Sequence, residues 1–398
     1  MARIRVSANG LYFVDEQGEP FFWLGDTLWE LFRLATTDDA RAMLERRREQ
    51  GFSAIQIMMT GVGDGTEPDL DGQKPWIGDD PAHPNEAYFR RVDPVIEAAG
   101  SLGLTLVVGI YHQRQREHIT TDNARSYARW AAERYRDAPH VVWTMYPEAK
   151  AEYVPVLREL AAGIKEGEGG THLITVHPDP SPTSSSFIHQ EEWLDFNMSQ
   201  PCVEYELIHK MVSYDYARTP PKPAVMAEGG YEGEEFGRTQ TALEIRQQAY
   251  WSYLAGGHHS YGHNDNWASP GTWRDWIDSP GARSLTVCRR ILTGLHEWWR
   301  LVPDQSLLAA GEGEGLTLNV AARHEAGDWC FVYLSSPSEV SLRMDGACGG
   351  HAADACWIDP TTGQRTGLGD VEGSGIRAFA TPDGWYDALL LLQKRSGS

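Results

Sequence analysis

The sequence of 398 residues has little positive charge, few cysteines and no long apolar run. Its 35 Lys and Arg residues are outnumbered by 56 Asp and Glu residues, which gives a net charge of −21. Nucleic acids and anionic membrane surfaces are bound by basic patches, so this balance disfavours both as partners. It also argues mildly against a strongly anionic substrate, unless a local basic pocket outweighs the total charge.

No stretch approaches the roughly 18 uninterrupted apolar residues that a membrane-spanning helix requires. Residues 1–7 lack the apolar segment of a secretory signal. The five cysteines form no Cys-x-x-Cys pair, and their odd number does not suit a complete set of disulfides. These features predict a cytoplasmic protein with reduced thiols. The sequence carries no signal for an oligomeric state.

Aromatic residues are abundant, with 15 Trp and 16 Tyr. One interpretation is a large aromatic core. The other is a cleft in which aromatic faces stack on sugar rings, because Tyr and Trp combine an apolar face with a polar tip. Composition alone leaves both open.

Strand-like apolar runs alternate with helical patterns over the first 300 residues. An N-terminal β-hairpin is predicted at 11–24. Further strands are predicted at 22–25, 54–58, 104–110, 141–145, 173–176, 194–198, 224–226 and 258–261. Such alternation indicates parallel strands covered by helices, and eight units suit a closed (β/α)8 TIM barrel. The alternative is an open doubly wound sheet, but no G-x-G-x-x-G or P-loop follows an early strand.

The pattern changes after residue 300. Short alternating runs separated by turns predict an antiparallel β-sandwich. We therefore expect a catalytic barrel over 1–300 and a small accessory domain over 301–398. Support of the barrel is the favoured role for this domain, and carbohydrate binding is the alternative.

Two carboxylates follow predicted barrel strands. Glu148 comes after the fourth strand and Glu228 after the seventh. Enzymes with this fold carry their catalytic groups at the carboxyl ends of the strands, so closure of the barrel brings both to one mouth. Cleavage of a glycosidic bond needs two such carboxylates. The simpler interpretation is that each Glu only caps the helix that follows.

Other polar and aromatic residues follow strands at the same end and are predicted to line one substrate pocket. They are Asp26, His112, His177, Gln200, Tyr231, His259, His263 and Trp267. For Asp26, a role in capping the next turn is an equally good interpretation.

Several segments, in the same order, resemble those of the apiosidase-like family of barrel glycoside hydrolases. They are FWLGDTLWEL at 22–31, QGFSAIQ at 50–56, NEAYF at 85–89, PAVMAE at 223–228 and GGHHSYGHN at 256–264. The segment WIDPTTG at 357–363 resembles the small β-domain that often follows these barrels.

The resemblance implies a retaining glycosidase without a cofactor, with Glu228 as nucleophile and Glu148 as general acid/base. An exo-acting enzyme on a plant or microbial glycan or glycoside is expected. Because the acid must be protonated, Glu148 should lie in the more apolar or more anionic environment. One departure concerns specificity. The family's fourth strand ends Trp-x-x-Gly-Gly-Asp, whereas Tyr146 and Pro147 precede Glu148 here, so apiose specificity does not follow.

Two other functions remain open. His258, His259 and His263 lie within six residues, and a barrel metallohydrolase could use them with His112 and His177. No His-x-His occurs on the first strand and no His-Glu-x-x-His is present, so no metal is expected. The other function is a non-catalytic, carbohydrate-binding barrel, which the presence of both carboxylates disfavours.

Overall fold

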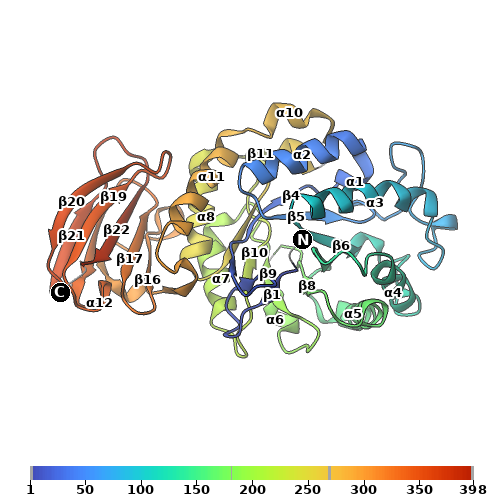
Figure 1. Cartoon of the computed structure of the whole chain (residues 1–398), viewed down its shortest axis with the longest axis horizontal. Coiled ribbons are helices and arrows are strands. Elements are labelled where there is room, and N and C mark those ends of the chain that lie inside the picture. The colour runs from blue at the N-terminus through green and yellow to red at the C-terminus, as the bar shows by residue number, and fades with distance from the viewer. Residues whose placement is uncertain (1–2, 181, 268–269, 396–398) are drawn as a thin grey trace.

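The computed structural model describes residues 3–180, 182–267 and 270–395. Eight parallel strands close into a barrel, which confirms the predicted fold (Figure 1). Around the barrel their order is β4 (Leu24–Thr27), β5 (Ala54–Met58), β6 (Thr105–His112), β7 (Val141–Tyr146), β8 (Ile174–Val176), β9 (Phe196–Ser199), β10 (Ala224–Met226) and β13 (His258–Tyr261). β6 ends two residues later than predicted, because a bulge between Gly109 and Tyr111 lets its pairing continue to His112.

Helices surround the barrel. The longer ones are α2 (Thr37–Glu49), α3 (Glu86–Ser101), α4 (Ala124–Arg134), α5 (Val154–Glu168), α7 (Ile208–Tyr216), α8 (Ala242–Leu254) and α11 (Pro280–Thr293). Short helices are α1 (Leu31–Leu34), α6 (Ser185–Ile188), α9 (Asn264–Trp267) and α10 (Trp273–Trp276). Thr241 and Glu244 form a reciprocal capping box that fixes the start of α8. Within the described ranges, no helix combines the length and the apolar character needed to cross a membrane.

Short antiparallel strands cover two places on the barrel. β1 (Arg5–Val6), β2 (Phe13–Val14) and β3 (Pro20–Phe21) form a small N-terminal sheet where the sequence predicts a two-stranded hairpin. Phe13 and Ile4 from this segment pack with barrel residues in one cluster. β11 (Gly233–Glu235) and β12 (Arg238–Gln240) form a hairpin beyond the end of β10.

Side-chain alternation along the strands separates the barrel interior from the helix layer. The interior cluster contains Trp23, Ala54, Val107, Val142, Phe196, Met198, Val225 and Ala227. Because successive residues point to opposite faces, residues at even offsets from these also point inward. Tyr146, four residues after Val142, therefore reaches the barrel mouth, whereas residues at odd offsets pack beneath the helices.

The C-terminal part is the predicted sandwich of two antiparallel sheets. One sheet has the order β14 (Leu301–Pro303), β16 (Val320–His324), β17 (Trp329–Leu334), β22 (Ala388–Lys394), β19 (Ala353–Ile358) and β20 (Arg365–Val371). The other contains β15 (Leu308–Ala310), β18 (Glu339–Arg343) and β21 (Ile376–Ala380), and the short helix α12 (Met344–Ala347) follows β18. A hydrophobic cluster that includes Val332, Leu342 and Leu390 lies between the sheets. We retain 1–300 and 301–398 as the proposed division into domains.

The outer face of the six-stranded sheet packs on the barrel helices α8 and α11 (Figure 1). The rings of Tyr250 and Tyr333 lie 4.6 Å apart across this interface. At the same interface, the guanidinium of Arg246 donates to both carboxylate oxygens of Asp387 at 2.9 and 2.8 Å. Both side chains are buried, and the Tyr333 hydroxyl donates a further bond to Asp387 at 2.9 Å. One apolar cluster with a buried ion pair therefore joins the two parts.

We predict that Asp387→Ala lowers the free energy of unfolding by about 3–5 kcal/mol, because it leaves the Arg246 charge buried without a partner. Replacing both residues, with Arg246→Met and Asp387→Leu, should recover most of the loss. Urea unfolding followed by tryptophan fluorescence measures both. Arg125→Ala, which removes an exposed ion pair with Glu166, is the control and should cost about 0–1 kcal/mol. Equal losses in Asp387→Ala and Arg125→Ala would contradict the role given to the buried pair.

Candidate active site

Glu228 lies just beyond β10, at the carboxyl end of the barrel, and is surrounded by polar groups from neighbouring strand ends. The Tyr146 hydroxyl donates to Oε1 of Gln200 at 2.6 Å and to Oε2 of Glu228 at 3.3 Å. Nε2 of His177 lies 3.4 Å from the same Glu228 oxygen. Tyr231 also hydrogen-bonds to Glu228. These groups come from the ends of β7, β8 and β9 and from the segment after β10, so the closed barrel brings them together.

Aromatic rings form one wall of this mouth. The ring of Tyr146 stacks on His112 at 4.9 Å with an interplanar angle of 10°. His177 lies on Tyr146 as well, with the ring centroids 4.3 Å apart. The indole of Trp29 stands edge-on to both Tyr146 and His177, and its Nε1 donates to the Tyr231 hydroxyl at 2.7 Å. Apolar ring surface next to hydrogen-bonding groups suits the two kinds of surface that a sugar presents.

The carboxyl group of Glu228 is poorly solvated, since only 11% of its side chain is exposed. Burial, and to a smaller extent the nearby Glu235 carboxylate, raises the pKa of Glu228 to about 8. Hydrogen bonds from Tyr231, Tyr146 and Gln200 oppose this shift but do not cancel it. Burial also holds the pKa of His112 at about 4 and that of His177 at about 3, so both rings are neutral at pH 7. These neighbours supply no positive charge to Glu228, which is therefore mostly protonated in the free protein at neutral pH.

Glu148 lies two residues beyond β7 in a more open environment. Its side chain is 29% exposed, and its carboxylate forms an ion pair with Lys150. The expectation that Glu148 occupies the more apolar or more anionic environment is wrong, because solvent and Lys150 reach the turn that carries it. The enclosed carboxyl group with the raised pKa is Glu228.

Asp179 is a third carboxylate near the mouth, and it was not among the predicted site residues. Its backbone N–H donates to the carbonyl of Pro147 at 2.8 Å, which joins its loop to the turn that carries Glu148. Nε2 of Gln113 donates to Oδ2 of Asp179 at 2.5 Å. Burial raises the pKa of Asp179, and the charge of Glu148 contributes to the increase. Asp179 follows β8, so the rule that selected Glu148 and Glu228 could have found it.

Five of the predicted residues meet around the Tyr146 ring. They are Glu228, His112, His177, Gln200 and Tyr231. Trp29 joins them. It lies in the quoted segment 22–31 but was not predicted, because it comes two residues after its strand and not at the strand end.

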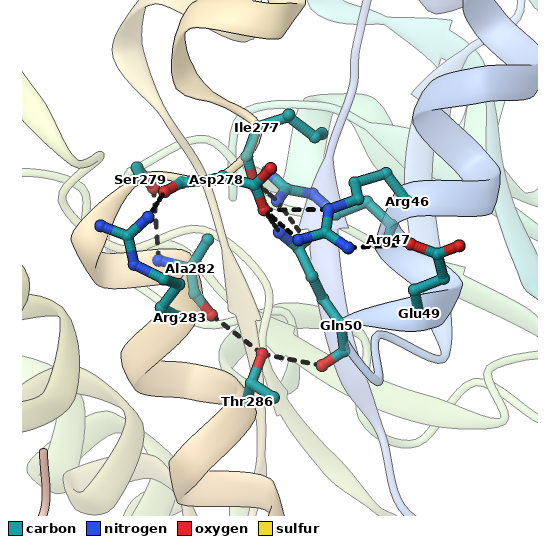
Figure 2. A network of polar contacts seen from close by, with 10 residues as sticks. All are labelled: Arg46, Arg47, Glu49, Gln50, Ile277, Asp278, Ser279, Ala282, Arg283 and Thr286. Atoms are coloured by element: carbon teal, nitrogen blue, oxygen red, sulfur yellow. Dashed lines mark hydrogen bonds and ion pairs between the residues drawn. The ribbon is translucent and has the colours of Figure 1, made fainter. Parts of the chain in front are cut away.

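Asp26 does not reach the mouth. It lies at an odd offset from Trp23, and its carboxylate is fully buried beneath α2. There it accepts hydrogen bonds from Nε of Arg47 at 2.7 Å and from the Thr27 backbone at 2.9 Å. The guanidinium of Arg47 also donates to the backbone carbonyl of Ile277, and Nε2 of Gln50 donates to the same oxygen (Figure 2). Asp26 thus ties the first barrel strand to the helix layer and is not placed to bind a sugar.

The remaining predicted residues are dispersed. His259 points away from the interior, with Nδ1 3.3 Å from the Ser252 hydroxyl of α8. His258 points inward at the amino end of its strand, where it packs on Phe13. His263 stacks on Trp276 and accepts a hydrogen bond from the Asp265 backbone. Trp267 is half-buried in α9. Within the described ranges, no three His, Cys, Asp or Glu side chains form a group that could hold a metal ion.

Comparison with known proteins agrees with this architecture. Residues 7–300 match the family model described as "Apiosidase-like, catalytic domain". Residues 302–393 match a model whose description refers to a collagen-binding domain of a collagenase. A comparison with curated proteins finds no significant match.

Solved structures of glycoside hydrolases share the whole fold. One, named only as a glycoside hydrolase, is 25% identical with a TM-score of 0.90, over 100% of this chain and 98% of that one. A family 5 glycoside hydrolase from Bacteroides vulgatus ATCC 8482 is also 25% identical, with a TM-score of 0.89, over 98% and 93% of the two chains. A family 27 β-L-arabinopyranosidase from Geobacillus stearothermophilus is 13% identical over 95% and 97%, with a TM-score of 0.62, and shares the fold alone.

We predict that Glu228→Gln stabilises the protein in alkaline solution. The pKa of this carboxyl group rises from an ordinary value of 4.5 to about 8 on folding, so folding disfavours its ionised form. The gain should be absent below about pH 4.5, should grow up to about pH 8, and should then stay constant at a few kcal/mol, on the order of 1.4 kcal/mol per pH unit. Urea unfolding at several pH values measures it.

Glu148→Gln is the matched control, because that side chain is more exposed and is paired with Lys150. It should show no comparable gain at alkaline pH. A stability gain in Glu228→Gln that did not change with pH would contradict the buried, uncompensated carboxyl group.

Proposed function

Because the chain belongs to the apiosidase-like family of catalytic domains, we propose that it is a glycosidase. The observation that carries this proposal is the mouth itself, where a buried carboxyl group, Glu228, meets an aromatic wall and several hydrogen-bond donors. A second carboxylate, Glu148, follows the fourth barrel strand. Glycoside hydrolysis uses two carboxylates, and aromatic and hydrogen-bonding side chains such as those around Glu228 suit a sugar.

In the proposed retaining mechanism, Glu228 attacks the anomeric carbon while Glu148 protonates the departing oxygen. Glu148 then removes a proton from the water that hydrolyses the glycosyl-enzyme. Tyr146 and Tyr231 donate toward Glu228, and such bonds stabilise its ionised form. Tyr146 and Pro147 stand where the family has two glycines and add bulk beside Glu148, so apiose specificity does not follow.

A second assignment of roles is favoured by the environment of Glu228. A carboxyl group with its pKa raised to about 8 is protonated at neutral pH, as a general acid must be. In that assignment Glu228 protonates the leaving group, and Glu148 acts as nucleophile or base. Both assignments describe a glycosidase, and they predict opposite pH dependence.

We predict that kcat/KM rises with pH and levels off above about pH 8, because it reports ionisation in the free enzyme and the nucleophile must be ionised. In the reversed assignment Glu228 is the general acid, so kcat/KM should fall above the same pH for a poor leaving group. It should not rise toward about pH 8 for an activated aryl glycoside, which needs little protonation. Initial rates on an activated aryl glycoside therefore distinguish the two. Glu235→Gln removes a charge that raises the pKa of Glu228, so it should move this limb to lower pH. Its retained carbonyl oxygen can still accept the hydrogen bond from the Tyr231 backbone.

We also predict that Glu228→Ala lowers kcat by about a thousandfold or more, because the nucleophile is lost. Azide entering the vacated space should attack from the nucleophile's side and give a glycosyl azide of inverted configuration. Glu148→Ala should retain activity on substrates with good leaving groups, and azide should then give a product of retained configuration. Product stereochemistry by NMR and rates over a series of leaving groups provide the measurements.

Arg125→Ala, which removes an exposed ion pair with Glu166 on the helix layer, is the control and should leave turnover unchanged. If Glu228→Ala and Glu148→Ala show the same leaving-group dependence and neither responds to azide, the roles are wrong. Full activity in both, together with inhibition by a chelator, would assign the chemistry to the histidines.

The substrate and location are proposed at a coarser level. We propose exo-action on a plant or microbial glycan or glycoside. The five unpaired cysteines favour a reducing compartment, and we propose the cytoplasm.

A further inference from the structure

A cavity of about 450 Å³ lies at the amino end of the barrel, remote from Glu228. It is bordered by the start of β13, by the N-terminal segment around Tyr12, and by residues 298–302, which lead into the sandwich. Tyr146 and Glu228 follow the opposite, carboxyl ends of the strands. Binding in this cavity is therefore spatially separate from catalysis.

Aromatic side chains line the cavity. The indoles of Trp298 and Trp299 are half-buried and perpendicular to each other, with ring centroids 5.9 Å apart. Tyr12 and Tyr216 contribute further ring surface. Gly256 has φ +85, and a Cβ there would lie 2.5 Å from the Tyr216 ring, so only glycine permits this ring to close the wall. A concave surface lined by aromatic rings is typical of a small-molecule site.

The charged residues that line the cavity are one cation, Arg300, and one carboxylate, Glu325. Arg300 donates to Glu325 at 3.1 Å, and to Glu297, which lies outside the lining, at 2.7 Å. His258 lines the same cavity and is 4% exposed, and its Nε2 has no hydrogen-bond partner within the described ranges. Burial lowers the pKa of His258 to about 3, so its ring is neutral.

We propose that this cavity is a second binding site, which takes a neutral saccharide. Ring C–H faces would pack on Trp298 and Trp299, while hydroxyl groups would bond to Arg300 and Glu325. The balanced charge disfavours an anionic or cationic ligand, and the mixture of aromatic and polar groups disfavours a wholly apolar one. The inference that the ligand is a saccharide rests on the proposed glycosidase function. The inference that a binding site exists rests on the cavity and its lining alone.

The test uses the full chain with Glu228→Gln, so that probes are not hydrolysed. Xylo-, arabino-, manno- and cello-oligosaccharides are titrated one at a time in a calorimeter. At least one should show binding that Trp299→Ala weakens tenfold or more. Arg300→Met keeps the apolar stem and should weaken the same binding. Tyr386→Ala, which removes an exposed ring from the sandwich, is the matched control and should leave it unchanged.

Thermal melting establishes that each variant is folded. Binding that is identical in Trp299→Ala, binding that Tyr386→Ala abolishes, or no binding of any probe would each overturn the proposal. Turnover of an aryl glycoside by the unmodified chain separates the two hypotheses. Turnover without Trp299-dependent binding would reject the second binding site and keep the proposed glycosidase function. Trp299-dependent binding without turnover would reject the glycosidase function and keep the site.

Discussion

The site depends on one constraint, the two-residue alternation of side chains along strands that close into a barrel. Each strand end offers an inward and an outward position, and closure makes every inward position at the carboxyl end a neighbour of the others. Tyr146, His177 and Gln200 occupy such positions and meet Glu228. Asp26 and His259 occupy outward ones and meet helices. A shift of one residue would exchange the two sets.

The same constraint explains what the sequence could predict. Eight strand–helix units could be counted from hydrophobic patterns, and the sandwich followed from shorter alternation. Strand ends could also be located well enough to place Glu228, His112, His177, Gln200 and Tyr231 at one end. The direction in which each side chain points, into the barrel or toward the helices, was harder to predict, because it depends on the register of each strand in the closed barrel. A polar residue after an apolar run is compatible with either face, and Asp26 shows the consequence.

Electrostatic environment could not be predicted from position. Asp26 and Glu228 are both buried carboxyl groups, but Asp26 has Arg47 at 2.7 Å, whereas among the described residues the groups that act on Glu228 are neutral donors and another carboxylate. The first is an ion pair that holds a strand to a helix. The second lacks a compensating cation, which costs stability and is typical of functional sites. The spacing of acids in the sequence contains neither fact, because both depend on side chains from distant segments.

The two proposed catalytic groups also differ in how the fold supports them. The segment that carries Glu228 leads into α8, and α8 is held by the sandwich through Arg246, Asp387 and the Tyr250–Tyr333 contact. Glu148 lies on a partly exposed turn, joined to the loop of Asp179 by a backbone hydrogen bond. The sandwich therefore packs on the half of the barrel that carries the buried carboxyl group. It contributes no residue to the contacts around Glu228 described above, so its contact with the candidate site runs through α8.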